Sequence, residues 1–545
     1  MPLLVDDALA ALLQDIRHGR VGLVVWGVLP HNDLFLWQCP LPVAYYVDDN
    51  PELWGGTCLN RPVRDPAALR DEEPGAVAVC LHRHLGPYLE QLGRHLDAIG
   101  PFRYFVPPRI GADPADLAGL LADWRRRSDR GSGVRGVAVL YLERLALGGA
   151  EGQLCHLAAG LADRGWSATM VLDRPVPPDA ARYGRELDRH GVGCVVIGQP
   201  SATDWHARLM ATLEPEAARL LRPLPPWLLP QILALIGFLR QVRPELAIGF
   251  LDRPNLILGV AAVLAGVPRV LLSGRNVDPT HFPHFFQGQT ADFRVIYRAL
   301  LALDGVWFSA NAEVGARSYD AWLGRPEGQT PVIANAVATM TPPRRSARAR
   351  AALRARWALP TEASLVLGVF RLEPEKQPTR FVEVLARLRT HRPEVHGVIC
   401  GTGSLTARVQ TRADELGVSE ALSLLGAVDD IPALLAEATL LLHVSHFEGT
   451  PNVLLEAQSL GLPVVSTRTG GSEAILAPAL RPYCREPDDS DGLAQACLAL
   501  ITDDALRRRL APRLRRFIRR RHTVDRLVNE TLAVVERFHI GERKE

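Results

Sequence analysis

Residues 446–463 read HFEGTPNVLLEAQSLGLP and place two glutamates, Glu448 and Glu456, on either side of a helix start. We predict Thr450 as the N-cap and Pro451 as the first helical residue, because proline lacks the N–H group that a first turn leaves unbonded. The helix-forming run NVLLEAQSL follows. Glu448 then lies in the loop before the helix, and Glu456 lies in its second turn, roughly 8 to 9 Å along the axis from the cap.

Two carboxylates placed in this way can hold opposite ends of one elongated ligand. Between them, the free amides of Asn452 and Val453 and the positive end of the helix dipole offer a place for an anion. A diphosphate with a hydroxyl-bearing group at each end fits this layout. Two glutamates on a surface helix are usually solvated, however, so the surrounding sequence has to decide between the two interpretations.

The composition is that of an ordinary globular protein. The 545 residues are too many for one core and predict about three domains. The net charge of +2 argues against a nucleic-acid partner. Lysine occurs only at positions 376 and 544, and every other basic residue counted in the charge is arginine. Lys376, in a loop after a predicted strand, therefore marks a place where a compact ammonium group is needed.

Cysteine usage and the N-terminal residues predict a cytoplasmic protein. The eight cysteines are scattered without a C-x-x-C pair, which favours reduced thiols over a disulfide framework or a zinc site. Asp6 and Asp7 stand where a signal peptide needs positive charge. The longest uncharged apolar stretch, residues 256–267, is too short to cross a bilayer, and we interpret it as a buried helix packed on a sheet.

Three arrays of alternating strands and helices predict an α/β fold. The strands are near-continuous apolar runs such as GVAVLYL and SLVLGVF, which are typical of parallel sheets covered on both faces. We predict domains at 1–128, 134–340 and 341–522, and a C-terminal helix and tail at 523–545 that packs back across the cleft. Ligands of such sheets bind beyond the carboxyl ends of the strands.

Polar or glycine-rich loops follow the predicted strands at this edge. An arginine and a lysine five residues apart can converge on a diphosphate, and glycines let backbone approach a ligand. Each signal is weak alone, but together they favour a binding site over coincidence. The loops contain Arg371 and Lys376 after SLVLGVF, Gly401 and Gly403 after HGVICG, and Gly148 and Gly149 at a helix start on the opposite wall.

Residues 364–477 resemble the nucleotide-binding half of glycosyltransferase family 4, whose members are retaining enzymes of the GT-B fold. The resemblance rests on GVFRLEPEKQP, ICGTGSL and SHFEGTPNVLLEAQSLGLPVVSTRTGGSEAI. Two earlier segments, GGAEGQLCHLAAGLADRGW and PVIANAV, resemble the other half. The implied fold is two facing Rossmann-like domains, 134–340 on the acceptor side and 341–522 on the donor side, preceded by a third, smaller Rossmann-like domain at 1–128.

The resemblance implies a hexosyltransferase-type enzyme that moves a sugar, with retention, from a nucleotide-sugar to a polysaccharide or lipid-linked glycan. A UDP-sugar is expected because it is the common donor in the family. Glu448 would contact the sugar near the reacting carbon, Glu456 would hold the ribose, and Arg371 and Lys376 would neutralise the diphosphate. No metal or other cofactor is expected, because these cations and the helix amides supply positive charge. The further donor-binding residues would be Gly148, Gly149, Thr450, Asn452, Val453, Gly401 and Gly403.

The sequence departs from the family at one strand end. Many members carry a histidine there, whereas the matching segment LLSGRNVDPTHFPH supplies Ser273, Arg275 and Asn276. This resembles the Ser-x-Arg-Asn variant of transferases that act on polyprenyl-linked or polysaccharide acceptors. We assign these three residues to the acceptor side of the reacting centre and interpret His281 and His284 as loop residues.

Two further motifs resemble a dinucleotide site and a metal site, and we interpret neither as functional. The segment WGVLPHND at 26–33 keeps only Gly27 of a dinucleotide-binding G-x-G-x-x-G pattern, although Asp48 stands where a ribose-binding acid belongs. We favour a recognition or assembly domain that binds another protein. Asp489 and Asp491 spell the D-x-D of metal-dependent transferases, but they lie in an acidic loop away from the strand ends, and we interpret them as solvated.

The C-terminal region and the overall function each leave an alternative open. Residues 507–521 include nine arginines beside an apolar stripe formed by Leu506, Leu510, Leu514, Phe517 and Ile518. We favour a helix that packs across the two GT-B halves over one that attaches peripherally to an anionic membrane surface. The alternatives to a transferase are a GT-B epimerase or hydrolase of nucleotide-sugars, and a catalytically silent scaffold in which the N-terminal domain carries the function.

Overall fold

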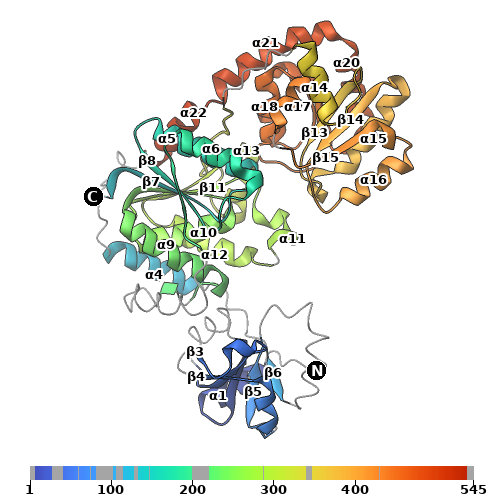
Figure 1. The fold of residues 1–545 in the computed structure, drawn as a ribbon. Coiled ribbons are helices and arrows are strands. Elements are labelled where there is room, and N and C mark those ends of the chain that lie inside the picture. Colours follow the sequence, from blue (N-terminus) through green and yellow to red (C-terminus); the bar gives the residue numbers. More distant parts are fainter. Residues whose placement is uncertain are drawn as a thin grey trace.

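The described residues form three α/β units, each built on a six-stranded sheet (Figure 1). We name them the N-terminal, middle and C-terminal units after the sheets formed by β1–β6, β7–β12 and β13–β18. The computed structural model describes residues 7–27, 41–58, 61–73, 75–81, 102–105, 114–127, 133–146, 148–198, 220–221, 223–286, 288–338, 346–428 and 430–536.

The N-terminal unit has a mostly parallel sheet in the order β3-β4-β2-β1-β5-β6, in which β3 and β4 pair antiparallel. Helix α1 (Asp7–Arg17) buries Leu12 and Ile16 against the sheet core. Asp48 accepts a hydrogen bond from the N–H of Asn50 (2.9 Å), and residues 28–33 of WGVLPHND lie outside the described residues. The strands are β1 (Gly22–Trp26), β2 (Val43–Val47), β3 (Thr57–Cys58), β4 (Arg61–Arg64), β5 (Val77–Cys80) and β6 (Arg103–Phe105).

The middle unit has a parallel sheet in the order β12-β11-β10-β7-β8-β9. Its helix α10 (Asp252–Leu264) is buried from Pro254 onward, which confirms the buried helix predicted from the apolar run. The strands are β7 (Val134–Leu142), β8 (Ser167–Leu172), β9 (Gly193–Val196), β10 (Pro244–Phe250), β11 (Arg269–Gly274) and β12 (Val306–Ala310). The other helices named below are α5 (Gly149–Ala162), α6 (Ala181–Arg189), α9 (Leu229–Val242) and α11 (Pro283–Phe286).

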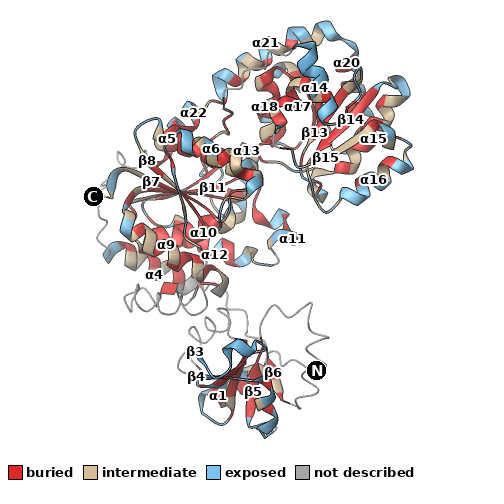
Figure 2. Cartoon of the chain, in the orientation of Figure 1, coloured by how far each residue is buried: buried red, intermediate tan, exposed pale blue. Residues whose placement is uncertain are grey.

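The C-terminal unit repeats this plan with the strand order β15-β14-β13-β16-β17-β18, again parallel. Figure 2 shows most strands of the two larger sheets as buried and the outer faces of their helices as exposed. The strands are β13 (Ser364–Val369), β14 (Val395–Cys400), β15 (Leu422–Gly426), β16 (Leu440–His443), β17 (Val464–Thr467) and β18 (Cys484–Arg485). The helices named below are α18 (Asn452–Leu460) and α20 (Ser490–Thr502).

The two larger sheets share a doubly wound topology. In each, the strand order reverses between the first and fourth strands, which are β7 and β10 in the middle unit and β13 and β16 in the C-terminal unit. Ligands of such sheets bind beyond the carboxyl ends of the strands at this switch point. The loops that follow these four strands are therefore the places to examine for chemistry.

Helix α4 (Pro114–Arg127) lies N-terminal to the predicted boundary at residue 128, yet its core contacts are with the middle unit. Leu117 and Leu121 are fully buried in that unit's core. The guanidinium of Arg125 donates to the carbonyls of Val267 and Pro268, at 2.7 and 3.0 Å. Arg125, in the arginine-rich end of α4, thus anchors the helix to the loop before β11.

The two C-terminal helices divide between the larger units. Helix α21 (Asp504–Arg521) buries Leu510, Leu514 and Ile518 in the C-terminal core, so the favoured packing of this stripe across both halves is wrong. Helix α22 (Val524–Glu536) instead packs on α5, where a Cβ at Gly160 would lie 2.6 Å from Val528. The chain therefore returns to the middle unit through α22, and the apolar stripe of α21 is not available to a membrane.

No described helix combines the length and the apolar character that a bilayer crossing requires. The seven cysteines within the described residues are free thiols, and six of them are buried.

Candidate active site

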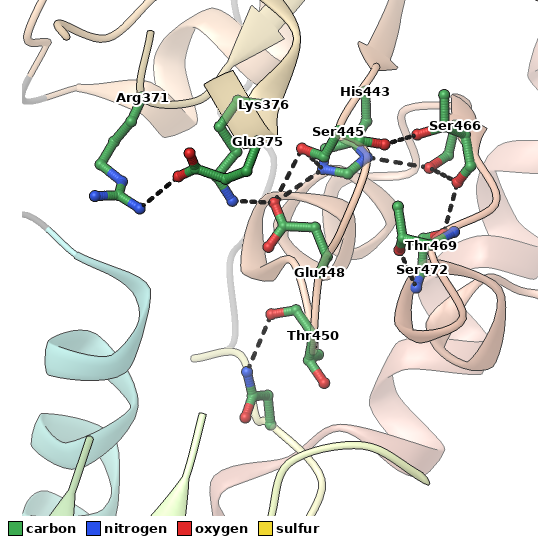
Figure 3. Close-up of polar contacts among 12 residues, drawn as sticks. Arg371, Glu375, Lys376, His443, Ser445, Glu448, Thr450, Ser466, Thr469 and Ser472 are labelled. Carbon is green, nitrogen blue, oxygen red and sulfur yellow. Dashed lines mark hydrogen bonds and ion pairs between the residues drawn. The ribbon is translucent and has the colours of Figure 1, made fainter. Parts of the chain in front are cut away.

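The loops after β13 and β16 meet at the switch point of the C-terminal unit, where Lys376 and Glu448 form an ion pair (Figure 3). Each side chain is only 13% exposed. The hydroxyl of Ser445 donates to Oε1 of Glu448 (3.1 Å), and Nε2 of His443 lies 3.4 Å from the same oxygen. Burial raises the pKa of Glu448, but the Lys376 ammonium and His443 outweigh it and hold that pKa well below its usual range. Glu448 is therefore ionised.

Buried hydroxyl groups fix the residues that contact Glu448. Nδ1 of His443 lies 3.2 Å from Oγ of Ser466 on the adjacent strand. The hydroxyl of Thr467 donates to the carbonyl of Ser445 (2.6 Å). Because all of these groups are buried at the ends of β16 and β17, the carboxylate of Glu448 is held by a rigid shell (Figure 3).

Arg371 and Lys376 hold different carboxylates in this structure. Nη2 of Arg371 lies 3.0 Å from Oε1 of Glu375, and its side chain is 60% exposed. The Arg371 guanidinium also lies 5.4 Å from the ring centroid of Phe285 in the middle unit, within cation–π distance. Arg371 thus sits at the mouth between the two larger units, whereas Lys376 lies deeper beside Glu448.

The start of α18 differs from its prediction. The helix begins at Asn452 with Pro451 as its N-cap residue, so the predicted cap at Thr450 is wrong. The hydroxyl of Thr450 instead donates to the carbonyl of Asn311 in the middle unit (2.9 Å). The helix ends at Gly461, whose φ of 79° is the left-handed conformation that glycine adopts readily.

Asn452 joins the helix start to two loops of the middle unit. Its Nδ2 donates to the carbonyl of Gly149 (2.8 Å), and its Oδ1 accepts from Nδ2 of Asn335 (2.6 Å). The facing carbonyl of Gly148 accepts from the hydroxyl of Tyr183 (3.1 Å). The glycine loop and the start of α18, with Val453 as its second residue, therefore face each other.

The carboxylate of Glu456 lies in the opposite setting to that of Glu448. It is half-buried, and within the described residues no hydrogen bond or ion pair involves it. Burial raises its pKa, and the charges of Arg182 and His156 in the middle unit only partly offset this effect. A carboxylate without donors is ready to accept hydrogen bonds from hydroxyl groups of a ligand.

The Ser273, Arg275 and Asn276 segment lies directly against the Glu448 loop. Arg275 is buried, donates to Oγ of Ser273 (3.3 Å) and Oδ1 of Asn335, and stacks 4.1 Å from the ring centroid of Phe250. In the described chain no carboxylate pairs with it. A buried cation without a counter-ion is costly, so this site can attract an anionic group.

Gly449 explains how closely the two units approach. A Cβ at this position would lie 2.8 Å from Oδ1 of Asn311 and 3.0 Å from the carbonyl of Arg275. Asn276 bonds within its own loop, where its Oδ1 accepts from the N–H of Val277 (2.9 Å). A side chain in place of the glycine would push the loop of Glu448 away from the middle unit.

The predicted glycines at 401 and 403 and the D-x-D segment each contact neighbouring parts of the C-terminal unit. A Cβ at Gly401 or Gly403 would lie 1.9 Å from the Phe370 carbonyl or 2.4 Å from that of Leu372, so these glycines hold the Arg371 loop against the end of β14. In the D-x-D segment, Oδ1 of Asp489 accepts from the N–H of Gly492 (2.7 Å) at the start of α20, while Asp491 lies 2.6 Å from Nε of Arg387.

A cavity of about 900 Å³ lies beside this cluster, between the middle and C-terminal units. His281, which the sequence analysis treats as a loop residue, lines it, with Nδ1 3.2 Å from Oδ2 of Asp278 and its ring 6.0 Å from that of Phe447. The side chain of His284 lies outside the described residues. The lining includes Val277, Asp278, His281, Arg317 and Trp322 of the middle unit and His446, Phe447, Arg468 and Thr469 of the C-terminal unit.

Four residues that join these parts are not among the site residues predicted from the sequence. His443 and Ser445 stand two residues apart at the end of the apolar run TLLLHVS, where polar side chains at a strand end are a usable signal. Asn335 lies in PVIANAV and Asn311 follows β12, and nothing local indicates that they reach the start of α18.

Comparison with known proteins agrees with this geometry. Residues 349–517 match the family model for glycosyl transferases group 1, so the C-terminal unit contains a glycosyltransferase group 1 domain. The chain is 30% identical over 327 residues to the Vi polysaccharide biosynthesis protein VipC/TviE of Salmonella typhi, covering 58% of this chain and 55% of that protein. It is 31% identical over 160 residues to the lipopolysaccharide core biosynthesis glycosyltransferase LpsE of Rhizobium meliloti, covering 29% and 46%. The chain thus spans about half the length of these relatives.

Solved structures confirm the predicted fold class. HepE of Anabaena, crystallised with UDP-glucose, superposes with a TM-score of 0.58 at 19% identity, covering 73% of this chain and 99% of that one. WaaG, a glycosyltransferase involved in lipopolysaccharide biosynthesis, superposes with a TM-score of 0.52 at 17% identity, covering 73% and 99%. The two larger units therefore form a GT-B fold.

Proposed function

We propose that the chain is a retaining glycosyltransferase that moves a sugar from a nucleotide-sugar to a polysaccharide or lipid-linked glycan. The observation that carries this proposal is the contrast between two carboxylates eight residues apart at one switch point. Glu448 is ionised and held beside a buried ammonium, whereas Glu456 has no partner within the described residues. One is suited to a reacting centre that develops positive charge, and the other to hydroxyl groups that do not react.

The donor would lie along the start of α18. Glu456 would accept hydrogen bonds from the ribose hydroxyls, and Glu448 would contact the transferred sugar. The diphosphate would lie between them, where the Gly148–Gly149 loop faces Asn452 and the amino end of α18 adds positive potential. A UDP-sugar is the proposed donor, since HepE was crystallised with UDP-glucose.

The leaving group would be stabilised by cations of the chain. Lys376 lies beside Glu448 and would neutralise the departing diphosphate, and Arg371 at the mouth would add a second charge. Preorganised charges of this kind stabilise a transition state without solvent rearrangement. We therefore propose that transfer needs no metal ion. Glu448 would orient the sugar and stabilise the positive charge at its anomeric carbon.

The acceptor would enter from the middle unit. The 900 Å³ cavity beside the Glu448 loop has room for a sugar residue, and the buried Arg275 lies between this loop and the core of the middle unit. The Vi polysaccharide and lipopolysaccharide relatives support a surface glycan as the acceptor.

A donor-consumption assay tests the proposal. The chain is incubated with labelled UDP-glucose, UDP-galactose or UDP-N-acetylglucosamine, with and without a bacterial membrane extract, and the products are separated. A transferase gives labelled glycan only with the extract, a hydrolase gives free sugar in both cases, and an epimerase changes the donor sugar. Glu448→Gln serves as the inactive control. If the wild type consumes no more donor than this control, the result favours a silent scaffold. The anomeric configuration of the product, measured by NMR, tests retention.

A further inference from the structure

The backbone of Leu251, directly after β10, adopts a conformation that side chains avoid. Its φ of 73° and ψ of 154° lie close to a region that is populated essentially by glycine. Strained residues of this kind persist where the surrounding structure forces them, and they cluster at ligand sites.

Four hydrogen bonds hold this segment in place. The N–H of Leu251 donates to the carbonyl of Ser273 (3.2 Å), and its own carbonyl accepts from the N–H of Asn255 (2.9 Å). The next residue, Asp252, accepts at Oδ1 from the hydroxyls of Tyr319 (2.7 Å) and Tyr297 (3.0 Å). The conformation therefore cannot relax without detaching β10 from β11 or from the buried helix α10.

The side chain of this strained residue is apolar and partly exposed to solvent. Leu251 is 36% exposed, although Phe250 before it and most of α10 after it are buried. A glycine would fit the same backbone without strain, so the fold alone does not need a leucine here.

The position of Leu251 points to a ligand. It follows β10 at the switch point of the middle unit, and an ion pair between Arg253 and Glu143 (3.2 Å) links the ends of β10 and β7 across that point. On its other side, Leu251 donates to the carbonyl of Ser273, and the hydroxyl of Ser273 accepts from Arg275. The carbonyl of Arg275 in turn lies against Gly449 in the Glu448 loop. Leu251 thus lies at the carboxyl end of the middle sheet, next to the Ser273–Arg275 segment and outside the residues that line the 900 Å³ cavity.

We propose that Leu251 is a specificity-determining residue that contacts the acceptor, and that the acceptor group it contacts is a sugar ring. A sugar ring has an apolar C–H face that suits the leucine and a hydroxyl edge that suits the adjoining Arg253–Glu143 pair. This inference rests on the proposed transferase function and adds the residue that selects the acceptor.

Two substitutions separate the side chain from the strain. Leu251→Gly removes both, and Leu251→Ala removes the side chain but keeps the strain. With labelled UDP-sugar donors and a panel of octyl glycosides as acceptor probes, both variants should lose about tenfold in acceptor kcat/KM, as expected for one lost leucine contact. Donor KM and donor hydrolysis without acceptor should not change. Leu251→Gly alone should also raise Tm by about 2 to 4 °C.

Arg243→Gly is the matched control, because Arg243 has a φ of 50° at the end of α9. It should raise Tm and leave acceptor kinetics unchanged. If both Leu251 variants keep acceptor kcat/KM within twofold of a wild type that transfers to the octyl glycosides, the role of Leu251 is wrong while the transferase function stands. A wild type that neither binds UDP nor consumes any donor overturns both.

Discussion

The ammonium of Lys376 and the carboxylate of Glu448 form an ion pair in which each side chain is 13% exposed. Removing one member of a buried pair leaves the other charge uncompensated. The two residues therefore act as a unit, and variants of each are best compared with each other.

Lys376→Ala should lower donor kcat/KM by an amount equivalent to about 2 to 4 kcal/mol, because the leaving diphosphate loses its nearest buried cation. Lys376→Arg should restore little, since the guanidinium is larger and cannot take the place of a compact ammonium. Initial rates at varied donor concentration measure the effect. Lys544→Ala, at the chain's other lysine, is the matched control. A loss below about threefold in Lys376→Ala contradicts the assignment.

Glu448→Gln and Glu456→Gln should differ in kind. Glu456 would contact the nucleoside, which does not change during transfer, so its loss should mainly raise donor KM. Glu448 would stabilise charge that develops at the anomeric carbon, so its loss should mainly lower kcat. Steady-state kinetics of both variants with the same donor decide this. A larger kcat loss in Glu456→Gln means that the two roles must be exchanged.

The same two variants should shift stability in opposite directions with pH. Burial raises the pKa of Glu456 above its unfolded value, so ionising it destabilises the fold once the pH passes that value. Glu456→Gln should therefore raise Tm at pH 7 to 8, and the gain should vanish toward pH 4. The pKa of Glu448 is lowered, so its stabilisation is present above the unfolded value and is lost as the pH falls. Glu448→Gln should lower Tm at pH 7. Thermal unfolding from pH 4 to 8 measures both, and equal shifts at every pH contradict this.

Much of this site follows from local sequence, but its assembly does not. The run after β16 and the stop at Gly461 predict a helix with Glu448 before it and Glu456 on it, because strand ends and glycine caps are short-range signals. The predicted N-cap is wrong, because the hydroxyl of Thr450 is directed toward the carbonyl of Asn311, 139 residues away in sequence, to which it donates, and the helix begins one residue later than predicted. In the same way, α4 joins the middle unit through Leu117 and Leu121, whose partners only the tertiary structure supplies.

Chelation should leave activity intact. Lys376 and Arg371 supply positive charge for the diphosphate, and α18 adds the amide end of its dipole. Transfer rates in EDTA should therefore equal those in buffer with added magnesium. Activity that EDTA abolishes and manganese restores would overturn the proposal of a metal-independent reaction.

Asn335 connects the acceptor and donor sides, and its acceptor and donor bonds can be separated. Its Oδ1 accepts from Arg275, and its Nδ2 donates to Oδ1 of Asn452 (2.6 Å) and to the carbonyl of Thr450 (3.4 Å). Asn335→Ala removes all three bonds and leaves a buried guanidinium with one acceptor fewer, which should cost about 1 to 3 kcal/mol of stability. Asn335→Asp keeps an acceptor for Arg275 and adds a counter-ion, so it should be less destabilising. It loses the donor to Asn452, so it should still lower donor kcat/KM. A double-mutant cycle with Asn452→Ala, measured by thermal unfolding and by donor kcat/KM, isolates the bond to Asn452. If Asn335 and Asn452 prove additive in both measurements, the bond seen between them does not couple the two units.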